Sequence, residues 1–422
     1  MDSMERRANQ WPPISREAQQ WMRDPDELAL LPNSARRRML PTYEASIPHL
    51  IANRDVILSP QLTARVSDLL VSIARFDGEQ MQRGYDLPAL LLRSESSASS
   101  QIEHLTSSVR NVALAELADE SPQNARLVAG NVAAMRKALA SQDEITVDSI
   151  RDVHRILINW SGESFGGELR REQVWVGGTP YSPHGAHYVP PTWQRVPEYL
   201  DDIVAFISRE DVDPIVQAAV AHAQFETVHP FIDGNGRTGR VLLHKILRRS
   251  GVLLHVTLPL SAGLLHNVDA YMKSLEAYQE GNPIAVVEQL VDALELSLMV
   301  GRLATTYYDA PYSVGKKSFR NWYSKFLGYS NIREGIVYSM NIVAVRCMME
   351  TISPELGVQY AEKMGITTRA AQNLVSRACE YEILRPLGNR RRGVFYQADE
   401  LIDVLEEASS LPSIRRMVGA VR

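Results

Sequence analysis

A run of twelve residues near the middle of the chain combines a base, a carboxylate, two closely spaced glycines and two arginines. It reads His229-Pro230-Phe231-Ile232-Asp233-Gly234-Asn235-Gly236-Arg237-Thr238-Gly239-Arg240. A glycine-bracketed turn that leads into a helix offers free backbone N–H groups and the positive end of a helix dipole to a phosphate. These residue types therefore predict a phosphate-binding turn with a histidine beside it.

Two helices are expected to hold this turn. Asp213 is a favourable N-cap and Pro214 suits the first helical position, so a helix is predicted to begin there. Pro230 disfavours the α conformation at His229, which predicts the end of that helix. A second helix is expected at about 237–250, closed by a glycine.

Each polar side chain of the run suits phosphate chemistry. A neutral His229 is placed to accept a proton from an incoming hydroxyl. Asp233 is a hard oxygen ligand for Mg²⁺ that is held largely by the phosphates themselves. Arg237 and Arg240, three residues apart on the first turn of the second helix, offer bidentate donors to phosphate oxygens. The lysine of a Walker-type phosphate loop is absent, so the pattern indicates another kind of site.

An ordinary polar corner between two helices is the alternative, because a lone Asp-Gly or Asn-Gly step indicates only a turn. Here, however, every fixed position of the signature H-P-F-x-[DE]-G-N-G-R-x-x-R is present, and in this stretch the chain resembles the Fic family. The resemblance implies an all-α, Fic-type helical core that transfers AMP from ATP to a protein hydroxyl. It also implies that the nucleotide is bound by Gly234, Asn235, Gly236, Arg237 and Arg240.

A second stretch resembles the inhibitory motif of self-restrained Fic proteins, [ST]-x-x-x-E-[GN]. Ser99 occupies its first position and Glu103 its glutamate, whereas His104 stands where glycine or asparagine is expected. A glutamate beside Arg240 would form a carboxylate–guanidinium pair and take the place of the γ-phosphate. The alternative is a solvated glutamate on a surface helix, which is expected from Leu87 to about His104. The resemblance implies autoinhibition through Glu103.

Residues 162–191 are rich in glycine and contain two short β-prone runs, at 173–176 and 187–189. They resemble the β-hairpin flap of the family, whose edge pairs with an extended target segment by strand addition. The docking residues expected are Val174, Trp175, Val176 and Gly177. The alternative is an ordinary surface hairpin. By the same resemblance Tyr271 is expected near the nucleotide base, although an aromatic residue at helical spacing is more often part of a core.

The remaining helices are predicted from apolar spacing and N-cap residues. They are expected at 60–77, 122–141, 147–159, 264–278 and 286–303, where they supply the scaffold around the turn. Residues 1–57 are punctuated by proline and give no clear prediction. We expect three regions: 1–110 with the inhibitory helix, 111–305 as the Fic core, and 306–422.

The C-terminal region shows a winged-helix pattern. Helices are expected at 354–364 and 368–381, and strands at 383–385 and 394–396 around a basic run of three arginines, 390–392. Outward polar side chains on the second helix suit DNA, whereas protein contact or dimerisation is the alternative. The local basic excess is slight.

Composition bounds the class of protein. The chain has 422 residues, 45% hydrophobic and 23% charged, which is typical of a globular protein with more than one domain. A net charge of −5 gives no whole-chain argument for nucleic acid. The two cysteines lack ligand or disulfide spacing, and no run of eighteen apolar residues occurs. We therefore expect a cytoplasmic protein that does not enter the membrane.

Two classes of function remain open. The first is a protein adenylyltransferase that uses ATP and Mg²⁺ to modify a Ser, Thr or Tyr hydroxyl of a target protein. The second is a nucleotide-sensing DNA-binding regulator whose output is the winged helix. An intact His229 favours the enzyme. A Fic-type transferase with another donor, moving UMP, phosphate or phosphocholine, is a third possibility, and the sequence leaves the oligomeric state open, a homodimer included.

Overall fold

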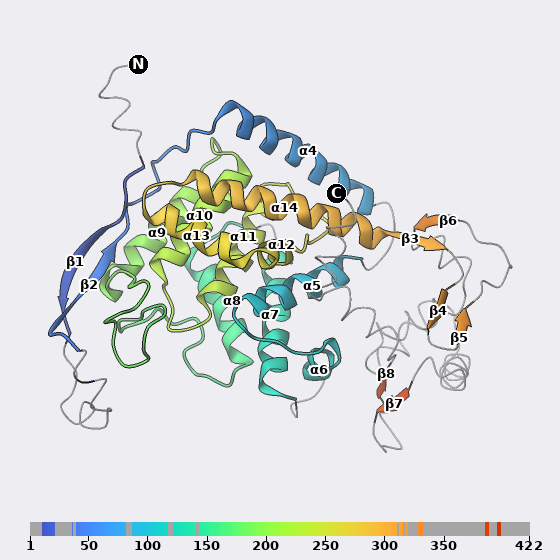
Figure 1. Cartoon of the computed structure of the whole chain (residues 1–422), viewed down its shortest axis with the longest axis horizontal. Coiled ribbons are helices and arrows are strands. Elements are labelled where there is room, and N and C mark those ends of the chain that lie inside the picture. The colour runs from blue at the N-terminus through green and yellow to red at the C-terminus, as the bar shows by residue number, and fades with distance from the viewer. Residues whose placement is uncertain are drawn as a thin grey trace.

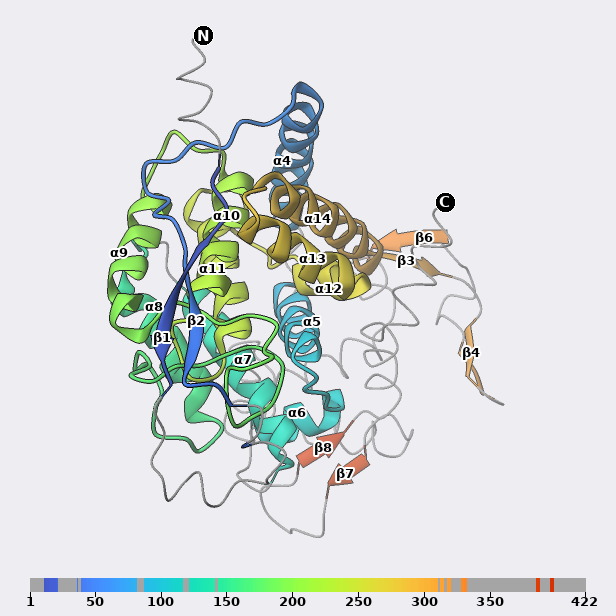
Figure 2. The same ribbon diagram turned by 60° about the vertical axis from the view of Figure 1, so that its left-hand side comes forward.

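In a computed structural model of the chain, the structure describes residues 11–21, 36, 39–81, 87–116, 121–140 and 143–309. It also describes short strand segments at 312–314, 317–319, 328–331, 385–387 and 395–397. Figures 1 and 2 show a helical body with a two-stranded ribbon along one side. The mostly helical fold class expected from the sequence is confirmed.

The helices of the body surround one central pair. They are α4 (Pro60–Met81), α5 (Leu87–Ile102), α6 (Val109–Ala115), α7 (Gln123–Leu139), α8 (Val147–Asn159), α9 (Val196–Ile207), α10 (Pro214–Val228), α11 (Asn235–Arg249), α12 (Leu260–His266), α13 (Val268–Gln279) and α14 (Ile284–Thr305). A short 3-10 helix, η1 (Trp193–Arg195), leads into α9. The central pair is α10 and α11, against which α5, α7, α8, α9 and α14 pack.

One continuous apolar core extends on both sides of residue 110, the boundary expected between the first two regions. It includes Leu62 and Ile73 of α4, Phe225 of α10 and Leu294 of α14, all buried. Helix α4 packs on α14, and α5 packs on α12. The N-terminal helices therefore share their hydrophobic core with the motif helices, which places α5 directly beside the twelve-residue motif.

Helix α10 is buried on nearly all sides, so its sequence is apolar around the circumference rather than along one stripe. Asp213 accepts a hydrogen bond from the Ile215 N–H, and Pro214 takes the first helical position. The predicted start and end of this helix are confirmed. The conformation after the end was not predicted, because His229 is left-handed (φ 52°, ψ 61°) rather than extended.

Other helix boundaries needed correction. Helix α4 continues through Gly78 to Met81 because Asp77, at its expected end, accepts hydrogen bonds from the backbone N–H groups of residues 254–256 and is fixed in helical form. Helix α7 begins at Gln123, with Pro122 as its N-cap. Helix α11 begins two residues earlier than predicted, at Asn235.

The helix expected at 264–278 is two helices. Asn267 between them is extended (φ −143°), and its side chain accepts a hydrogen bond from the Ala270 N–H, so that it caps α13. Asparagine competes with the helix for its own backbone in this way, which ends α12.

An N-terminal ribbon went unpredicted. Strand β1 (Ser15–Gln20) pairs antiparallel with β2 (Thr42–Ile47), with Ser15 opposite Ile47 and Gln20 opposite Thr42. β1 is polar and lacks β-branched residues, so neither composition nor alternation indicated a strand.

Three further antiparallel pairs lie at the C-terminal end of the described residues. They are β3 (Thr306–Asp309) with β6 (Gly328–Asn331), β4 (Tyr312–Val314) with β5 (Lys317–Phe319), and β7 (Arg385–Leu387) with β8 (Phe395–Gln397). β7 and β8 fall within two residues of the strands predicted for the wing. The helices predicted at 354–364 and 368–381, and the basic run 390–392, lie outside the described residues, so the winged helix stays a prediction. No helix in the described part of the chain is long and apolar enough to cross a membrane.

Candidate active site

The predicted phosphate-binding turn lies at the N-terminus of α11. Gly234 caps the helix in a left-handed conformation, φ 77°, which a side chain would oppose. The Asn235 amide accepts a hydrogen bond from the Phe231 N–H and donates one to the Phe231 carbonyl, both at 2.9 Å, so it closes the loop on itself. Both polar atoms of the Asn235 side chain are therefore engaged in holding the loop.

His154 of α8 packs against the turn and is hydrogen-bonded to it. Its ring stacks on Phe231 with centroids 3.7 Å apart and planes within 6°. Its Nδ1 accepts a hydrogen bond from the Gly167 N–H at 2.9 Å, so its Nε2 carries the proton that is shared with the Asp233 carbonyl at 3.0 Å. Burial lowers the pKa of His154 to about 4, and the ring is neutral. Sequence analysis missed this residue, whose only signal is a histidine on the apolar face of a helix.

The geometry of His229 fixes which of its ring nitrogens is basic. Nδ1 lies 3.2 Å from the carbonyl oxygen of Glu226. A carbonyl can only accept, so in the neutral ring Nδ1 carries the proton and Nε2 has the free lone pair. Burial lowers the pKa of His229 to about 4, so the ring is neutral at pH 7. The residue thus has the protonation state that a general base needs.

Arg237 is buried and its donors are incompletely used. Its side chain is 3% exposed, and its Nη2 lies 3.5 Å from the Asp233 carboxylate. Its Nε and Nη1 have no hydrogen-bond partner among the described residues. Buried guanidinium donors without partners are costly, and phosphate oxygens at the turn would satisfy them. The arrangement suits an anionic ligand.

Arg240 is satisfied by a different part of the chain, helix α5. Its Nε donates to the Ser99 hydroxyl at 2.9 Å, and its Nη2 donates to the Ser99 carbonyl at 2.8 Å and to Glu103 Oε1 at 2.7 Å. Burial opposes ionisation of Glu103, but the charge and hydrogen bond of Arg240 hold the pKa of that carboxyl below its usual value. The structure therefore brings together the two stretches that the sequence predicted to meet, as an ion pair.

The end of α5 explains the residue that departs from the inhibitory motif. The Leu105 N–H bonds to the Ser100 carbonyl at 2.9 Å, and the His104 N–H bonds to the Gln101 carbonyl at 3.0 Å. This pair of bonds is a Schellman cap, which requires a left-handed residue, and His104 has φ 59°. Glycine or asparagine adopts that conformation more easily, which is why the motif expects one of them. Glu103 occupies the C-cap position just before it.

The Glu103 carboxylate lies directly over the anion-binding turn. A Cβ added at Gly236 would collide with Glu103 Oε1. Gly236 therefore gives the carboxylate the close approach to the helix start that an anionic ligand would also need.

A third polar residue of α5 contacts α11, farther from the turn than Ser99 and Glu103. Glu95 of α5 is fully buried and accepts hydrogen bonds from the Ser261 N–H at 2.7 Å and from the Ser261 hydroxyl. Its Oε1 also lies 2.9 Å from Nε2 of His244 on α11. Residues 95 and 99 are four apart on one face of α5, and Glu103 follows at its C-cap. Residues 240 and 244 are four apart on α11, so the two helices meet along matched polar positions. Sequence analysis did not identify Glu95 or His244.

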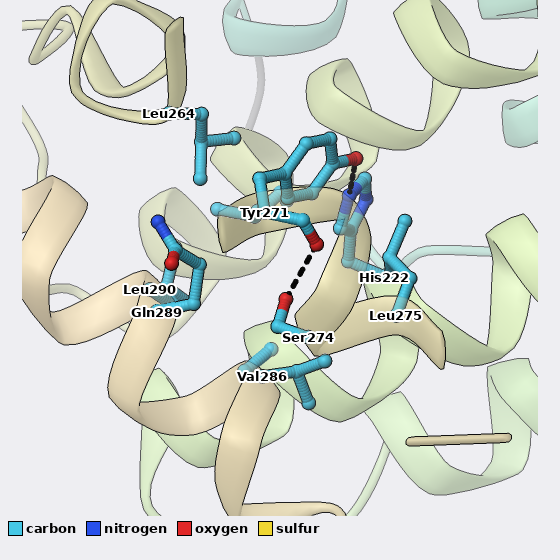
Figure 3. A pocket seen from close by; sticks show the side chains of 10 residues that line it. His222, Leu264, Tyr271, Ser274, Leu275, Val286, Gln289 and Leu290 are labelled. Carbon is cyan, nitrogen blue, oxygen red and sulfur yellow. Dashed lines mark hydrogen bonds between the residues drawn. The ribbon is translucent and has the colours of Figure 1, made fainter. Parts of the chain in front are cut away.

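Tyr271 is buried against α10 and does not line an open cleft. It is 3% exposed, and its hydroxyl lies 2.8 Å from Nε2 of His222. Figure 3 shows both around a small cavity that Ser274 and Gln289 also line and that has room for about one water molecule. Burial raises the pKa of the Tyr271 hydroxyl. This is the environment of a core aromatic residue, and contact with a nucleotide base stays a prediction.

Asp233 is exposed, as expected for a metal ligand that shares the ion with phosphates and water. Its side chain is 70% exposed, and among the residues that the structure describes its contact is the long one to Arg237. No cluster of three or more His, Cys, Asp or Glu suited to a metal occurs among the residues that the structure describes. A lone exposed carboxylate beside an anion-binding turn fits Mg²⁺ that takes most of its ligands from phosphates and water.

The flap is an irregular hairpin. The Val176 N–H bonds to the Tyr188 carbonyl at 2.8 Å, and the His187 N–H bonds to the Val176 carbonyl at 2.9 Å. The regular strands expected at 173–176 and 187–189 reduce to this bridge and a second between Thr179 and Ser182, because residues 177, 178 and 185 are left-handed glycines. The backbone groups of Trp175 and Gly177 make no hydrogen bonds to other described residues.

The N-terminal ribbon continues the flap on its other side. The Ser46 N–H of β2 bonds to the Val189 carbonyl at 3.1 Å. The ring of Trp175 meets Trp21 edge to face at 5.7 Å. One edge of the flap is therefore hydrogen-bonded to β2, whereas the backbone groups of Trp175 and Gly177 on the opposite edge have no hydrogen-bond partner among the described residues.

Comparison with known proteins agrees with this geometry. A family model described as "Fic/DOC family" matches residues 144–247, the segment from α8 to α11 that holds the histidine, the turn and the flap. The chain carries a Fic domain. The resemblance drawn from the motif is thereby confirmed.

The Fic domain is similar to that of proteins named as adenylyltransferases. Protein adenylyltransferase fic-1 of Caenorhabditis elegans is 42% identical over 113 residues, which are 26% of this chain and 20% of that protein. Protein adenylyltransferase Fic of Drosophila willistoni is 37% identical over 114 residues, 27% of this chain and 22% of that protein. The chain thus spans about a fifth of the length of the curated relatives it matches. A solved structure of Fic-1 (aa134–508) from C. elegans is 27% identical with a TM-score of 0.45, covering 58% of this chain and 74% of that one.

Proposed function

We infer that the Fic domain transfers AMP from ATP to a Ser, Thr or Tyr hydroxyl of a target protein. The observation that carries the proposal is a neutral His229, with its Nε2 lone pair free, on the same loop as a turn flanked by the unpaired donors of Arg237. The names of the relatives support the same reaction.

In this reaction the target oxygen attacks the α-phosphorus of ATP, and pyrophosphate leaves as the bond from that phosphorus to the bridging oxygen breaks. His229 Nε2 takes the proton of the attacking hydroxyl. The backbone N–H groups at 234–236 and the two arginines hold the β- and γ-phosphates, and Asp233 is the residue to hold Mg²⁺, which would neutralise phosphate charge. Positioning and electrostatics supply most of the rate.

The target is proposed to dock as an added strand on the open edge of the flap. In an antiparallel ladder alternate residues face the same neighbour, so Val176 faces Tyr188 while Trp175 and Gly177 direct their backbone groups outward. Val176, whose residue surface is 42% exposed, would contact the target through its side chain.

Glu103 is proposed to restrain this activity. While it holds Arg240, the γ-phosphate cannot use that arginine, so ATP is not presented in line with the hydroxyl. The C-terminal region is predicted to bind DNA or a second copy of the chain. Duplex binding at low salt tests the DNA prediction separately, and neither prediction enters this proposal.

The deciding experiment uses ATP labelled separately at the α- and γ-phosphates. The full chain carrying Glu103→Gly is incubated with Mg²⁺, and protein-bound label is counted. Retention of α label alone is expected, because only AMP stays on the protein. Incorporation of γ label would mean phosphate transfer, and labelling only from a UTP or CDP-choline donor would replace ATP with that donor.

A matched control keeps the test specific. Glu280 is an exposed C-cap residue of α13, as Glu103 is the C-cap residue of α5. Glu280→Gly should leave labelling at the wild-type level. Omission of Mg²⁺, or addition of EDTA, should abolish labelling if Asp233 holds the ion as proposed.

A further inference from the structure

One buried arginine lies outside the twelve-residue motif and pairs with no carboxylate among the described residues. Arg170, 1% exposed, uses its side chain entirely on main-chain carbonyls. Its Nε donates to the His229 carbonyl at 2.8 Å, its Nη1 to the Glu172 carbonyl at 3.1 Å, and its Nη2 to the carbonyls of Pro191 and Val228. Its own N–H donates to the Pro230 carbonyl at 3.0 Å.

These carbonyls belong to two separate structures. Val228 and His229 form the C-terminal end of α10, where carbonyls have no partners within the helix and where the dipole is negative. A guanidinium is the side chain that satisfies several such carbonyls at once. The Glu172 and Pro191 carbonyls lie at the two ends of the flap hairpin, residues 173–190, within the glycine-rich segment 162–191 that also contains Arg170. One planar group therefore joins the end of the base-carrying helix to both ends of the flap.

The contact to His229 acts on a strained residue. A non-glycine residue in the left-handed region is strained, so it persists only where neighbours hold it. The conformation directs the imidazole back toward the Glu226 carbonyl, and that hydrogen bond selects the Nδ1–H tautomer. Loss of the Arg170 contact would therefore change both the position and the tautomer of the ring.

We propose that Arg170 is a positioning residue for target modification: it holds His229 in its left-handed conformation and ties the flap to it, so that a docked hydroxyl meets Nε2 at a fixed distance. The inference rests on the proposed adenylyltransferase function. A second tie supports the geometry, since the Tyr188 hydroxyl of the flap donates to the Thr227 carbonyl at 2.8 Å.

The test compares Arg170→Lys with its parent, full-length Glu103→Gly protein, using α-labelled ATP. Lysine keeps the charge but cannot bond several carbonyls with one planar group. The kcat for labelling should fall about ten- to a hundredfold, while calorimetric ATP affinity changes less than twofold, because the turn at α11 is untouched. Tyr188→Phe, a milder change that removes one hydroxyl, should lower kcat a few-fold in the same way. Arg195→Lys is the control, since Arg195 pairs with Glu17 in the ribbon.

Two further measurements separate positioning from folding. Nitrogen-15 shifts of the His229 ring should indicate the Nδ1–H tautomer in the parent and a mixture in Arg170→Lys. Free guanidinium should partly restore kcat to Arg170→Ala and not to His229→Ala. Unchanged kcat in both Arg170→Lys and Tyr188→Phe would overturn the proposal, as would a loss of ATP affinity and of folding equal to the loss of kcat. Absence of labelling in the parent itself would instead refute the proposed function.

Discussion

The twelve-residue motif has two flanks that are held in different ways. On the α5 flank, Arg240 and His244 meet side chains of a separate helix, Ser99, Glu103 and Glu95. On the flap flank, Arg170 holds main-chain carbonyls at the end of α10 and at both ends of the flap. The first flank depends on a few charged groups, whereas the second depends on the backbone itself.

This difference means that the contacts on the α5 flank can be released more easily than those on the flap flank. Helix α5 is rich in serine, a weak helix former, so tertiary contacts stabilise it more than its own propensity does. Removal of the Glu103 carboxylate is expected to change that flank and to leave the hydrogen bonds within the twelve-residue motif in place. On the flap flank the Glu172 and Pro191 carbonyls both accept hydrogen bonds from Arg170. The α5 flank therefore suits regulation, and the flap flank suits alignment of the reactants.

The largest effect is expected at the base on the fixed flank. His229→Ala in the Glu103→Gly background should lower labelling by about 10²- to 10⁴-fold, because the proton acceptor is lost. ATP affinity, measured by calorimetry, should change little, since the turn is intact. His49→Ala, a histidine outside the site that contacts the Pro13 carbonyl, is the control. Labelling of the alanine variant at the parent rate would remove His229 from the mechanism.

The next effect tests the releasable flank. Glu103→Gly should raise auto-modification about ten- to over a hundredfold, because a charge-assisted contact to a buried arginine is worth about 1.5–3 kcal/mol. Arg240→Ala should not activate, since the phosphate needs the same guanidinium, and the double variant should behave like Arg240→Ala. Mass spectrometry of the three proteins under saturating ATP and Mg²⁺ decides this. Wild-type labelling in Glu103→Gly would mean that residues 99–104 are an ordinary helix end.

A smaller effect is expected further along the same flank. Glu95→Gln keeps the shape but removes the charge that faces His244 and caps Ser261, so α5 should be held less firmly. Labelling should rise about two- to tenfold, less than in Glu103→Gly, and the melting temperature should fall. Glu288→Gln, on the exposed face of α14, is the isosteric control. A lower melting temperature without any rise in labelling would show that Glu95 stabilises the fold without contributing to inhibition.

The smallest effect is a pH dependence that is nearly flat. The pKa of His229 is about 4, and protonation as pH falls would remove the base. Protonation of His229 should therefore change the kcat of Glu103→Gly less than twofold between pH 8 and pH 6, and should lower it strongly only below about pH 5. A loss centred near pH 6.5, the ordinary histidine value, would mean that the ring is not desolvated as the geometry implies.

The sequence predicted the parts of this site that lie close together in the chain. The ends of α10, the turn at Gly234 and the adjacent base follow from local rules for caps, proline and glycine. The meeting of Glu103 with Arg240 is a long-range contact, and it was predicted only because a short motif resembled one in a family. The roles of the motif residues stay predictions until the variants above are measured.

The missed residues share a physical reason. Arg170, His154 and Glu95 act through tertiary contacts with backbone groups or with a distant helix, and nothing in their local spacing indicates those partners. The polar strand β1 was missed because its partner β2 lies more than twenty residues away and its residue types are not typical of strands. The left-handed conformation of His229 was missed because proline restricts the preceding residue without choosing between the extended and the left-handed regions.

The left-handed conformation of His104 affects how stable the contact between α5 and the twelve-residue motif is. A side chain in that conformation costs about 1 kcal/mol more than glycine would, and the cost is borne only while α5 keeps its Schellman cap over the motif. A difference of this size corresponds to about a fivefold change in the fraction of molecules that hold α5 in the capped state. His104 has this effect although it contacts neither Arg240 nor the nucleotide turn. Under the restraint proposed for Glu103, His104→Gly should therefore lower basal labelling about fivefold and leave the maximum rate unchanged.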